Sequence, residues 1–293
     1  MLRAFTLALL CLCFAAPAEA ANLAVTPAGS DSASCTATAP CKTFERAYNA
    51  AASGDTINVA AGRYPVQNVP AGSKALTFKG GSGVLVTQLY NKASDLTFDG
   101  INVDAQFVRK QTGLQLGGNR VTFKNAEVGN IADEKNIVNG DGHVIDNVRF
   151  HDVVMTSTGE AEGVHLECLY SQASNITIKN SRFENCAVMD VFFTRGTWWS
   201  PPQAEYGGFT LINNYFDAPR FANGRCCHYF SVKWAWQSKY DRASLHGNTY
   251  LAGVAADDMN GNTATFYNSV ESCNTPAFNL RGITKQTCSS GSP

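Results

Sequence analysis

A short phrase that recurs along most of the chain constrains its fold more than any other feature. The phrase reads apolar, any, apolar, any, Asn or Gly, any two, apolar. Complete copies occupy residues 96–103, 121–128, 176–183 and 209–216, and weaker copies begin at Leu76, His143, Ala243 and Ala264. The Asn or Gly positions of successive copies are 20, 25, 22, 33, 33, 34 and 21 residues apart, so the chain is a repeat with insertions.

Each copy predicts a short strand followed by a bend. The apolar positions alternate as they do in a strand, and Asn or Gly tolerates the positive φ of a tight bend. One such unit cannot bury its apolar side alone, but stacked units can, with equivalent strands paired at ~4.8 Å. The spacing is too short for a propeller blade and lacks the leucine consensus of a horseshoe repeat. The pattern therefore predicts an all-β solenoid of parallel strands.

The first part of the chain also carries a family resemblance. The stretches Val25-Thr-Pro-Ala-Gly-Ser-Asp31 and Ala39-Pro-Cys-Lys-Thr-Phe44, with residues 50–57 and 61–64, resemble the first coil of right-handed parallel β-helix proteins of the pectate-lyase-like superfamily. The resemblance implies that fold for nearly all of the mature chain. It implies no single activity, because the architecture carries lyases, hydrolases, epimerases and adhesins.

The expected domain organisation is simple. Residues 1–20 are typical of a signal peptide, with Arg3, an apolar run over 4–16 and Ala18-Glu-Ala20, which predicts a secreted, extracellular protein. Residues 21–293 form one domain, with long coils over about 147–247 and a loose tail over about 274–293. No later apolar run is long enough to span a bilayer.

A helix is expected over about residues 43–52. Its apolar residues fall at helical spacing, and Thr43 can serve as the N-cap. Such a helix would cover the open end of the solenoid, where the first coil presents unpaired strand edges.

The cysteines predict disulfides. The chain has ten, and Cys11 and Cys13 leave with the signal peptide. The remaining eight are an even number in an oxidising compartment, with Cys35 to Cys41 and Cys273 to Cys288 as the expected local pairs. A metal cluster is the alternative, although no CxxC spacing occurs. The candidates are Cys35, Cys41, Cys168, Cys186, Cys226, Cys227, Cys273 and Cys288.

The charge balance bears on the partner. The chain has 23 Lys plus Arg, 24 Asp plus Glu and a net charge of -1, which gives no electrostatic reason to bind nucleic acid. The long coils place loops over one side of a rod, an arrangement suited to an extended polymer. An extracellular polysaccharide is therefore the expected partner. The oligomeric state stays open.

The long coils also hold the candidate site. Alternation in residues 163–170 points His165 and Glu167 outward, and alternation in 186–193 points Asp190 outward, with Arg195 just beyond. Stacking in register would bring Glu167 and Asp190 to within about 5 Å of each other. Two carboxylates that close share a proton, bind a cation such as Ca²⁺, or pair with Arg195 or Lys233.

These residue types suit β-elimination from an acidic sugar. The reaction needs a base, for which His165 is the candidate, and cations that neutralise the substrate carboxylate, for which Arg195 and Lys233 are candidates. The expectation is a lyase acting on a uronate-containing glycan, with a glycoside hydrolase as second choice. Burial or divergence of Glu167 and Asp190 would end this lyase hypothesis.

Two other interpretations of the same residues stay open. Glu167 and Asp190 can belong to a solvated surface, with His165 bonding a neighbour, and the solenoid can be a carbohydrate-binding or adhesion protein without turnover. Neither the Asn-Thr-Asp, paired Asp, His-Gly order of polygalacturonases nor the Trp-Ile-Asp-His of pectate lyases occurs. No catalytic residue is therefore taken from the resemblance.

Aromatic residues of the long coils are the candidates for substrate binding. Trp198 and Trp199 either stack on sugar rings or cover the flank of the solenoid. In residues 226–234 the orientation is ambiguous, since either His228 or the set Tyr229, Ser231 and Lys233 lies outside. Tyr229 is taken as a third binding candidate.

Overall fold

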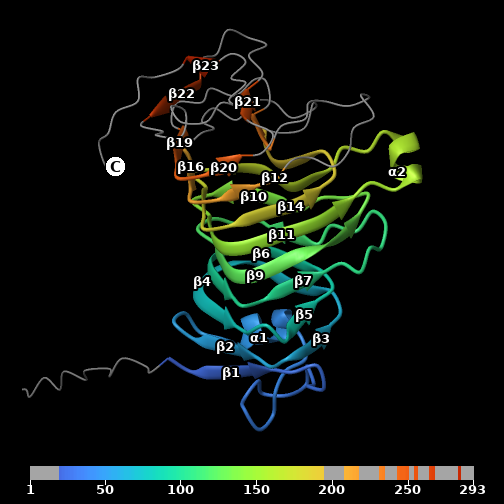
Figure 1. The fold of residues 1–293 in the computed structure, drawn as a ribbon. Coiled ribbons are helices and arrows are strands. Elements are labelled where there is room, and N and C mark those ends of the chain that lie inside the picture. Colours follow the sequence, from blue (N-terminus) through green and yellow to red (C-terminus); the bar gives the residue numbers. More distant parts are fainter. Residues whose placement is uncertain are drawn as a thin grey trace, which may run out of the picture.

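The computed structural model describes residues 20–194, 208–217, 231–234, 243–250, 254–256, 264–267 and 283–284. Within these residues the chain winds into a solenoid of strands (Figure 1). Every pairing between named strands is parallel. The predicted parallel β-helix is confirmed.

The strands form three stacks, each named here after one of three consecutive strands of the same coil. The β12 stack contains β8 (Leu114–Leu116), β10 (Ile137–Asp141), β12 (Glu167–Ser174), β15 (Met189–Phe193), β18 (Val232–Trp234) and β21 (Val254–Ala256), with the first residues of β4 (Gln67–Lys79) and β6 (Leu89–Asp99). This stack carries most of the candidate site.

The β13 stack contains β1 (Asn22–Val25), β2 (Thr56–Val59), β13 (Thr177–Lys179), β16 (Phe209–Ile212), β19 (Ala243–His246), β22 (Ala264–Tyr267) and β23 (Ile283–Thr284). The last residues of β4 and β6 and the first of β9 (Thr122–Ala132) and β11 (Val144–Val154) complete it. The β14 stack contains β3 (Gly62–Tyr64), β5 (Val84–Val86), β7 (Asn102–Asp104), β14 (Arg182–Cys186), β17 (Tyr215–Phe216) and β20 (Thr249–Tyr250), with the last residues of β9 and β11.

The repeat phrase sets the register of the β13 stack. Phe98 pairs with Phe123, and Ile178 pairs with both Ile145 and Leu211, so equivalent phrase positions lie directly over one another. The copy that begins at Ala264 does not keep this register, because Ala243 pairs with Phe266.

The bend positions adopt the backbone conformation that the phrase predicts. Asn125, Asn147, Asn180 and Asn213 have φ values of 53°, 54°, 52° and 53°. Asn147 Nδ2 donates to Asn125 Oδ1 at 2.9 Å, and Asn213 Nδ2 donates to Asn180 Oδ1 at 3.0 Å, so side chains of successive bends bond along the solenoid.

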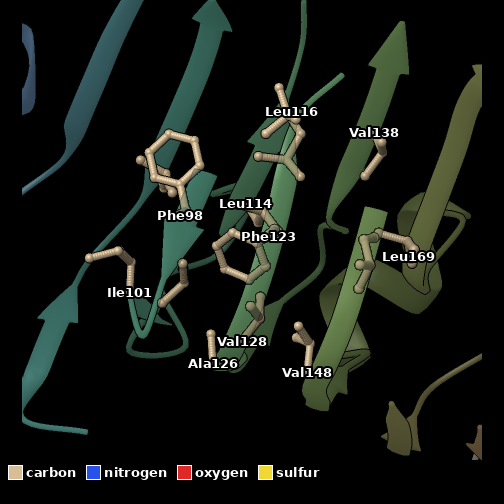
Figure 2. Packing of buried hydrophobic residues seen from close by; sticks show 14 of the residues in the cluster. Phe98, Ile101, Leu114, Leu116, Phe123, Ala126, Val128, Val138, Val148 and Leu169 are labelled. Atoms are coloured by element: carbon tan, nitrogen blue, oxygen red, sulfur yellow. The ribbon is translucent and has the colours of Figure 1, made fainter. Parts of the chain in front are cut away.

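The interior is a column of apolar side chains. Rings of equivalent positions stack, with centroids 5.2 Å apart for Phe78 and Phe98, 4.9 Å for Phe150 and Phe183 and 5.0 Å for Phe183 and Phe216. Figure 2 shows Phe98 and Phe123 extending into the same interior from neighbouring strands. Each fully buried ring contributes about 1.5–3 kcal/mol, so the interior is the main source of stability.

The expected helix is present as α1 (Phe44–Ala50). Thr43 is its N-cap, and the Thr43 hydroxyl accepts a hydrogen bond from Arg46 N at 3.1 Å. Phe44 is fully buried, and its ring lies 4.9 Å from the Phe78 ring. The helix thus joins the core, while its role in closing the end of the solenoid stays a prediction.

Two disulfides occur among the described residues. Cys35 and Cys41 are bonded as predicted, and Cys168 is bonded to Cys186, a pairing that the sequence left open. Cys226, Cys227, Cys273 and Cys288 lie outside the described residues.

The described residues include little of the signal peptide and of the tail that the sequence predicts. Residues 1–19 of the expected signal peptide lie outside the described part of the chain, as does the expected tail except for β23. In the part that is described, no helix combines the length and the apolarity needed to cross a membrane.

Candidate functional site

The outer surface of the β12 stack carries a column of half-buried side chains, here called the outer column. Its members share one register position in successive coils and are Tyr90, Gln115, Ile137, Tyr170 and Phe192. On the opposite side of the same strands, Leu169, Val191 and Phe193 are fully buried. The column therefore presents a largely aromatic and apolar strip on the outside of the solenoid.

The sequence predicted that Glu167 of β12 and Asp190 of β15 point outward. For β12 this prediction was wrong. The prediction that Glu167 points outward fails because the strand begins only at Glu167, so alternation counted from residue 163 has the wrong phase. Cys168 is buried through its disulfide, while Leu169 fills the core. For β15 the predicted phase is right, since Met189, Val191 and Phe193 are buried.

Glu167 and Asp190 do not form an exposed carboxylate pair. Both are 0% exposed. Glu167 pairs with Met189, so Asp190 occupies the next position and leaves its strand on the opposite side. The predicted surface cluster is therefore contradicted by both burial and direction.

His165 keeps a partly exposed position beside the outer column. Its side chain is 30% exposed, and its Nδ1 contacts Glu167 Oε1 as an ion pair. The imidazole centroid lies 5.6 Å from the Phe192 ring. A buried carboxylate needs a compensating charge or proton, and His165 is the titratable side chain that lies against Glu167.

Lys135 and Tyr170 complete the surroundings of His165. Lys135 Nζ donates to the His165 carbonyl at 3.0 Å and lies 5.1 Å from the Tyr170 ring centroid. Burial is the main cause that raises the pKa of Tyr170, the Glu167 charge raises it further, and a hydrogen bond with Thr194 opposes both. The Tyr170 hydroxyl therefore stays protonated well above neutral pH.

The segment before His165 is positioned by a short helix, α2 (Ser157–Glu162). Its N-cap Thr156 accepts a hydrogen bond from Gly159 N at 3.1 Å and donates its own backbone N–H to Asp133 Oδ1 at 2.7 Å. Gly163 caps the end of the helix with a φ of 68°, a left-handed conformation that glycine adopts without the strain that a β-carbon would cause. This anchoring fixes where the chain enters β12.

Asp190 is fully buried although it lies on the same side of β15 as Phe192. Its backbone N–H donates to the Ser231 carbonyl at 3.1 Å. Burial raises the pKa of Asp190 well above its ordinary value, the nearby Asp217 charge adds to the rise, and a hydrogen bond with Ser231 opposes it. Burial therefore favours the protonated, uncharged form of the Asp190 carboxyl group.

The expected cation gains no ligand set from these residues. Among the residues that the structure describes, no group of three or more His, Cys, Asp or Glu side chains could hold a metal ion. Glu167 and Asp190 diverge, so they cannot share a cation from adjacent positions. Ca²⁺ as a cofactor of the protein stays a prediction.

The remaining candidates are only partly placed. Arg195, Trp198, Trp199 and Tyr229 lie outside the described residues, and their expected roles stay predictions. Lys233 is described through its backbone alone, where it pairs with Phe192 at the next position of the outer column.

The structure adds Lys135, Tyr90 and Tyr170 to the residues expected from sequence. The repeat phrase marks the β13 stack, and no phrase marks the strands of the β12 stack. The bends at Asn147 and Asn180 lie one coil apart. Counting back the same number of residues from each bend reaches Ile137 and Tyr170, which do pair in the structure.

The three stacks and their parallel register define a right-handed parallel β-helix protein. The chain belongs to the family described as Pel9A-like, right handed beta helix region, whose model matches residues 23–191. No curated protein matches the chain in sequence.

Several solved structures are similar in shape. The pectate lyase Pel9A is 11% identical with a TM-score of 0.48, and the alignment covers 92% of this chain and 80% of that one. The Streptococcus pneumoniae surface protein and adhesin PfbA is 12% identical with a TM-score of 0.49, and the alignment covers 80% of this chain and 73% of that one. A rhamnogalacturonan lyase is 14% identical, with a TM-score of 0.44 and coverage of 83% and 74%. At these identities the similarities say nothing about activity.

Proposed function

We propose that this is a secreted protein that binds an extracellular, uronate-containing polysaccharide along the outer column of the β12 stack. The observation that carries the proposal is the column itself. Tyr90, Tyr170 and Phe192 stand half-exposed at one register position of parallel coils. Aromatic rings stack on the apolar faces of sugars, and a column along the solenoid offers successive contacts to an extended chain.

A cation beside the column fits an acidic glycan. Lys135 Nζ lies 5.1 Å from the centroid of the Tyr170 ring. A lysine ammonium is a hydrated point charge that attracts carboxylates without demanding one geometry. The two disulfides agree with a secreted protein, because such bonds persist in oxidising compartments.

The second candidate is a polysaccharide lyase, and His165 is the specific observation in its favour. With Nδ1 held by the Glu167 carboxylate, the imidazole Nε2 can take the proton beside the sugar carboxylate. The Tyr170 hydroxyl can then protonate the leaving oxygen as the carbon–oxygen bond breaks and the ring double bond forms. The pectate lyase Pel9A, whose name the matching family carries, belongs to this reaction class. In this arrangement Glu167 positions His165 and does not touch substrate.

Binding is tested by affinity electrophoresis in gels containing polygalacturonate, alginate or a neutral glucan. We expect retardation by the uronate polymers, weakened by Tyr170→Ala and unchanged by Tyr215→Ala, which removes a half-buried aromatic ring from the β14 stack. Unfolding midpoints of both variants control for folding. Equal retardation by all three polymers, or equal weakening by both variants, would contradict the proposal.

Turnover is tested on the same polymers by the ultraviolet absorbance of unsaturated uronates. A lyase gives a signal that His165→Ala abolishes and Glu167→Gln lowers, with binding preserved in both. Retardation without any absorbance assigns the protein to the non-catalytic class.

A further inference from the structure

The loop over residues 105–113, which connects β7 to β8, exposes an apolar tip. Phe107 is 47% exposed and Val108 is 42% exposed. Together with Val66, these are the exposed large apolar side chains in the part of the chain that the structure describes. An exposed phenylalanine next to a valine needs an explanation, because most large apolar side chains in this solenoid are buried.

The backbone of this tip is also strained. Gln106 and Phe107 have φ values of 57° and 56°, in the left-handed region that bulky residues avoid. Elsewhere in the solenoid, Asn and Gly hold most of the left-handed positions. Strain of this kind persists only where the surroundings impose it, and it is concentrated at functional sites.

The surroundings of the tip do impose its conformation. Phe107 N donates to the Asn130 carbonyl at 2.6 Å, and Lys110 N donates to the Ala132 carbonyl at 3.0 Å. Arg109 forms ion pairs with the buried Asp133 and, at 3.1 Å, with Glu162. These hydrogen bonds and ion pairs hold the loop in the conformation that exposes the Phe107 ring.

These bonds tie the tip to the segment that leads into the candidate site. Glu162 ends α2, and His165 follows three residues later. On the other side, the loop leads directly into β8, whose Gln115 is a member of the outer column. Figure 1 shows α2 beside the end of the β12 stack from which the loop enters.

We propose that Phe107 is a further polysaccharide contact, which stacks on a sugar ring at the edge of the outer column. This inference rests on the proposed function and extends it to a residue outside the β12 stack. A protein partner is the poorer fit, because specific protein interfaces bury about 800 Å² on each side and this tip offers two apolar side chains flanked by Arg109 and Lys110. Sugar rings need only one aromatic side chain for each contact.

The test uses Phe107→Asn, because asparagine tolerates the left-handed region and lacks the ring. We expect the dissociation constant for polygalacturonate, measured by calorimetry, to rise about tenfold, which is about 1.4 kcal/mol. The unfolding midpoint should stay equal or rise by about 2 °C as strain is relieved. Phe107→Trp keeps a ring and should bind as the wild type does, and Tyr215→Ala serves as the matched control.

The outcomes separate this inference from the proposed function. Wild-type affinity in Phe107→Asn overturns the inference while the proposed function stands. Weaker binding together with a lower unfolding midpoint also overturns it, because Phe107 then serves the fold. If the wild-type protein binds no uronate polymer, the proposed function fails and the inference fails with it.

Discussion

Replacement of Asn147 should show how much of the stability of the solenoid comes from its left-handed bends. Asn147 has a φ of 54°, is exposed, and donates through Nδ2 to Asn125 Oδ1 at 2.9 Å. Asn147→Gly removes the hydrogen bond and keeps the conformation accessible. Asn147→Ala removes the same bond and in addition places a β-carbon that disfavours the left-handed region.

The two substitutions should differ by the strain that alanine adds less the flexibility that glycine adds to the unfolded chain. Loss of the exposed hydrogen bond costs about 0.5–1 kcal/mol in both. The left-handed conformation costs alanine about 1–2 kcal/mol, whereas glycine loses a few tenths to about 1 kcal/mol through its flexible unfolded state. We therefore expect Asn147→Ala to be less stable than Asn147→Gly by about 1 kcal/mol, a difference of about 2–4 °C in the unfolding midpoint.

The assay is thermal and urea unfolding of both variants, with Asn58 as the matched control. Asn58 lies in strand β2, so there the order should reverse, with glycine costing more than alanine. If Asn147→Ala is as stable as Asn147→Gly, the bend carries no strain and the structural reason given for the repeat phrase is wrong.

Two further predictions concern pH. The pKa of Asp190 is raised in the folded protein, so the unfolded chain loses this proton first as pH rises. Wild-type stability should therefore fall as pH rises above the ordinary pKa near 3.8. In urea titrations, Asp190→Asn should remove that slope and be more stable than the wild type at pH 7. Burial lowers the pKa of His143, whose Nδ1 accepts from Val121 N at 3.2 Å, so stability should fall as pH drops below about 6.5 and the unfolded histidine takes up a proton. His143→Gln should lose this dependence, and an unchanged pH profile would refute the neutral, buried assignment.

The fold could be predicted because each copy of the repeat phrase contains the residues that define both a strand and the bend after it. Alternation of apolar residues defines each strand, and the Asn or Gly defines the bend that follows. Phe98, Phe123 and Ile145 are thereby fixed as vertical neighbours before any coordinates are known. The phrase works because stacked coils repeat one local environment, so equivalent positions face equivalent demands.

The candidate site was less predictable because the β12 stack lacks such a phrase. Alternation alone fixes orientation only if the first residue of the strand is known, and a shift of one residue reverses every side chain. Glu167 was misplaced in this way, whereas His165, which precedes the strand, was correctly expected to be accessible. The Cys168–Cys186 bond also decides the phase locally, and cysteine spacing could not reveal it.

The buried carboxylates of the solenoid differ in the side chains that compensate them. Asp133 is buried and well compensated, since Arg109 pairs with it and Thr156 donates to it, and it anchors α2. Glu167 is equally buried, and the group that lies against it is His165. A purely structural position would favour a permanent cation or an apolar side chain, because burying a carboxylate against a titratable partner costs stability. We propose that this cost is accepted because the imidazole serves a ligand, which would place the chemistry at the entry to β12 rather than along the regular coils.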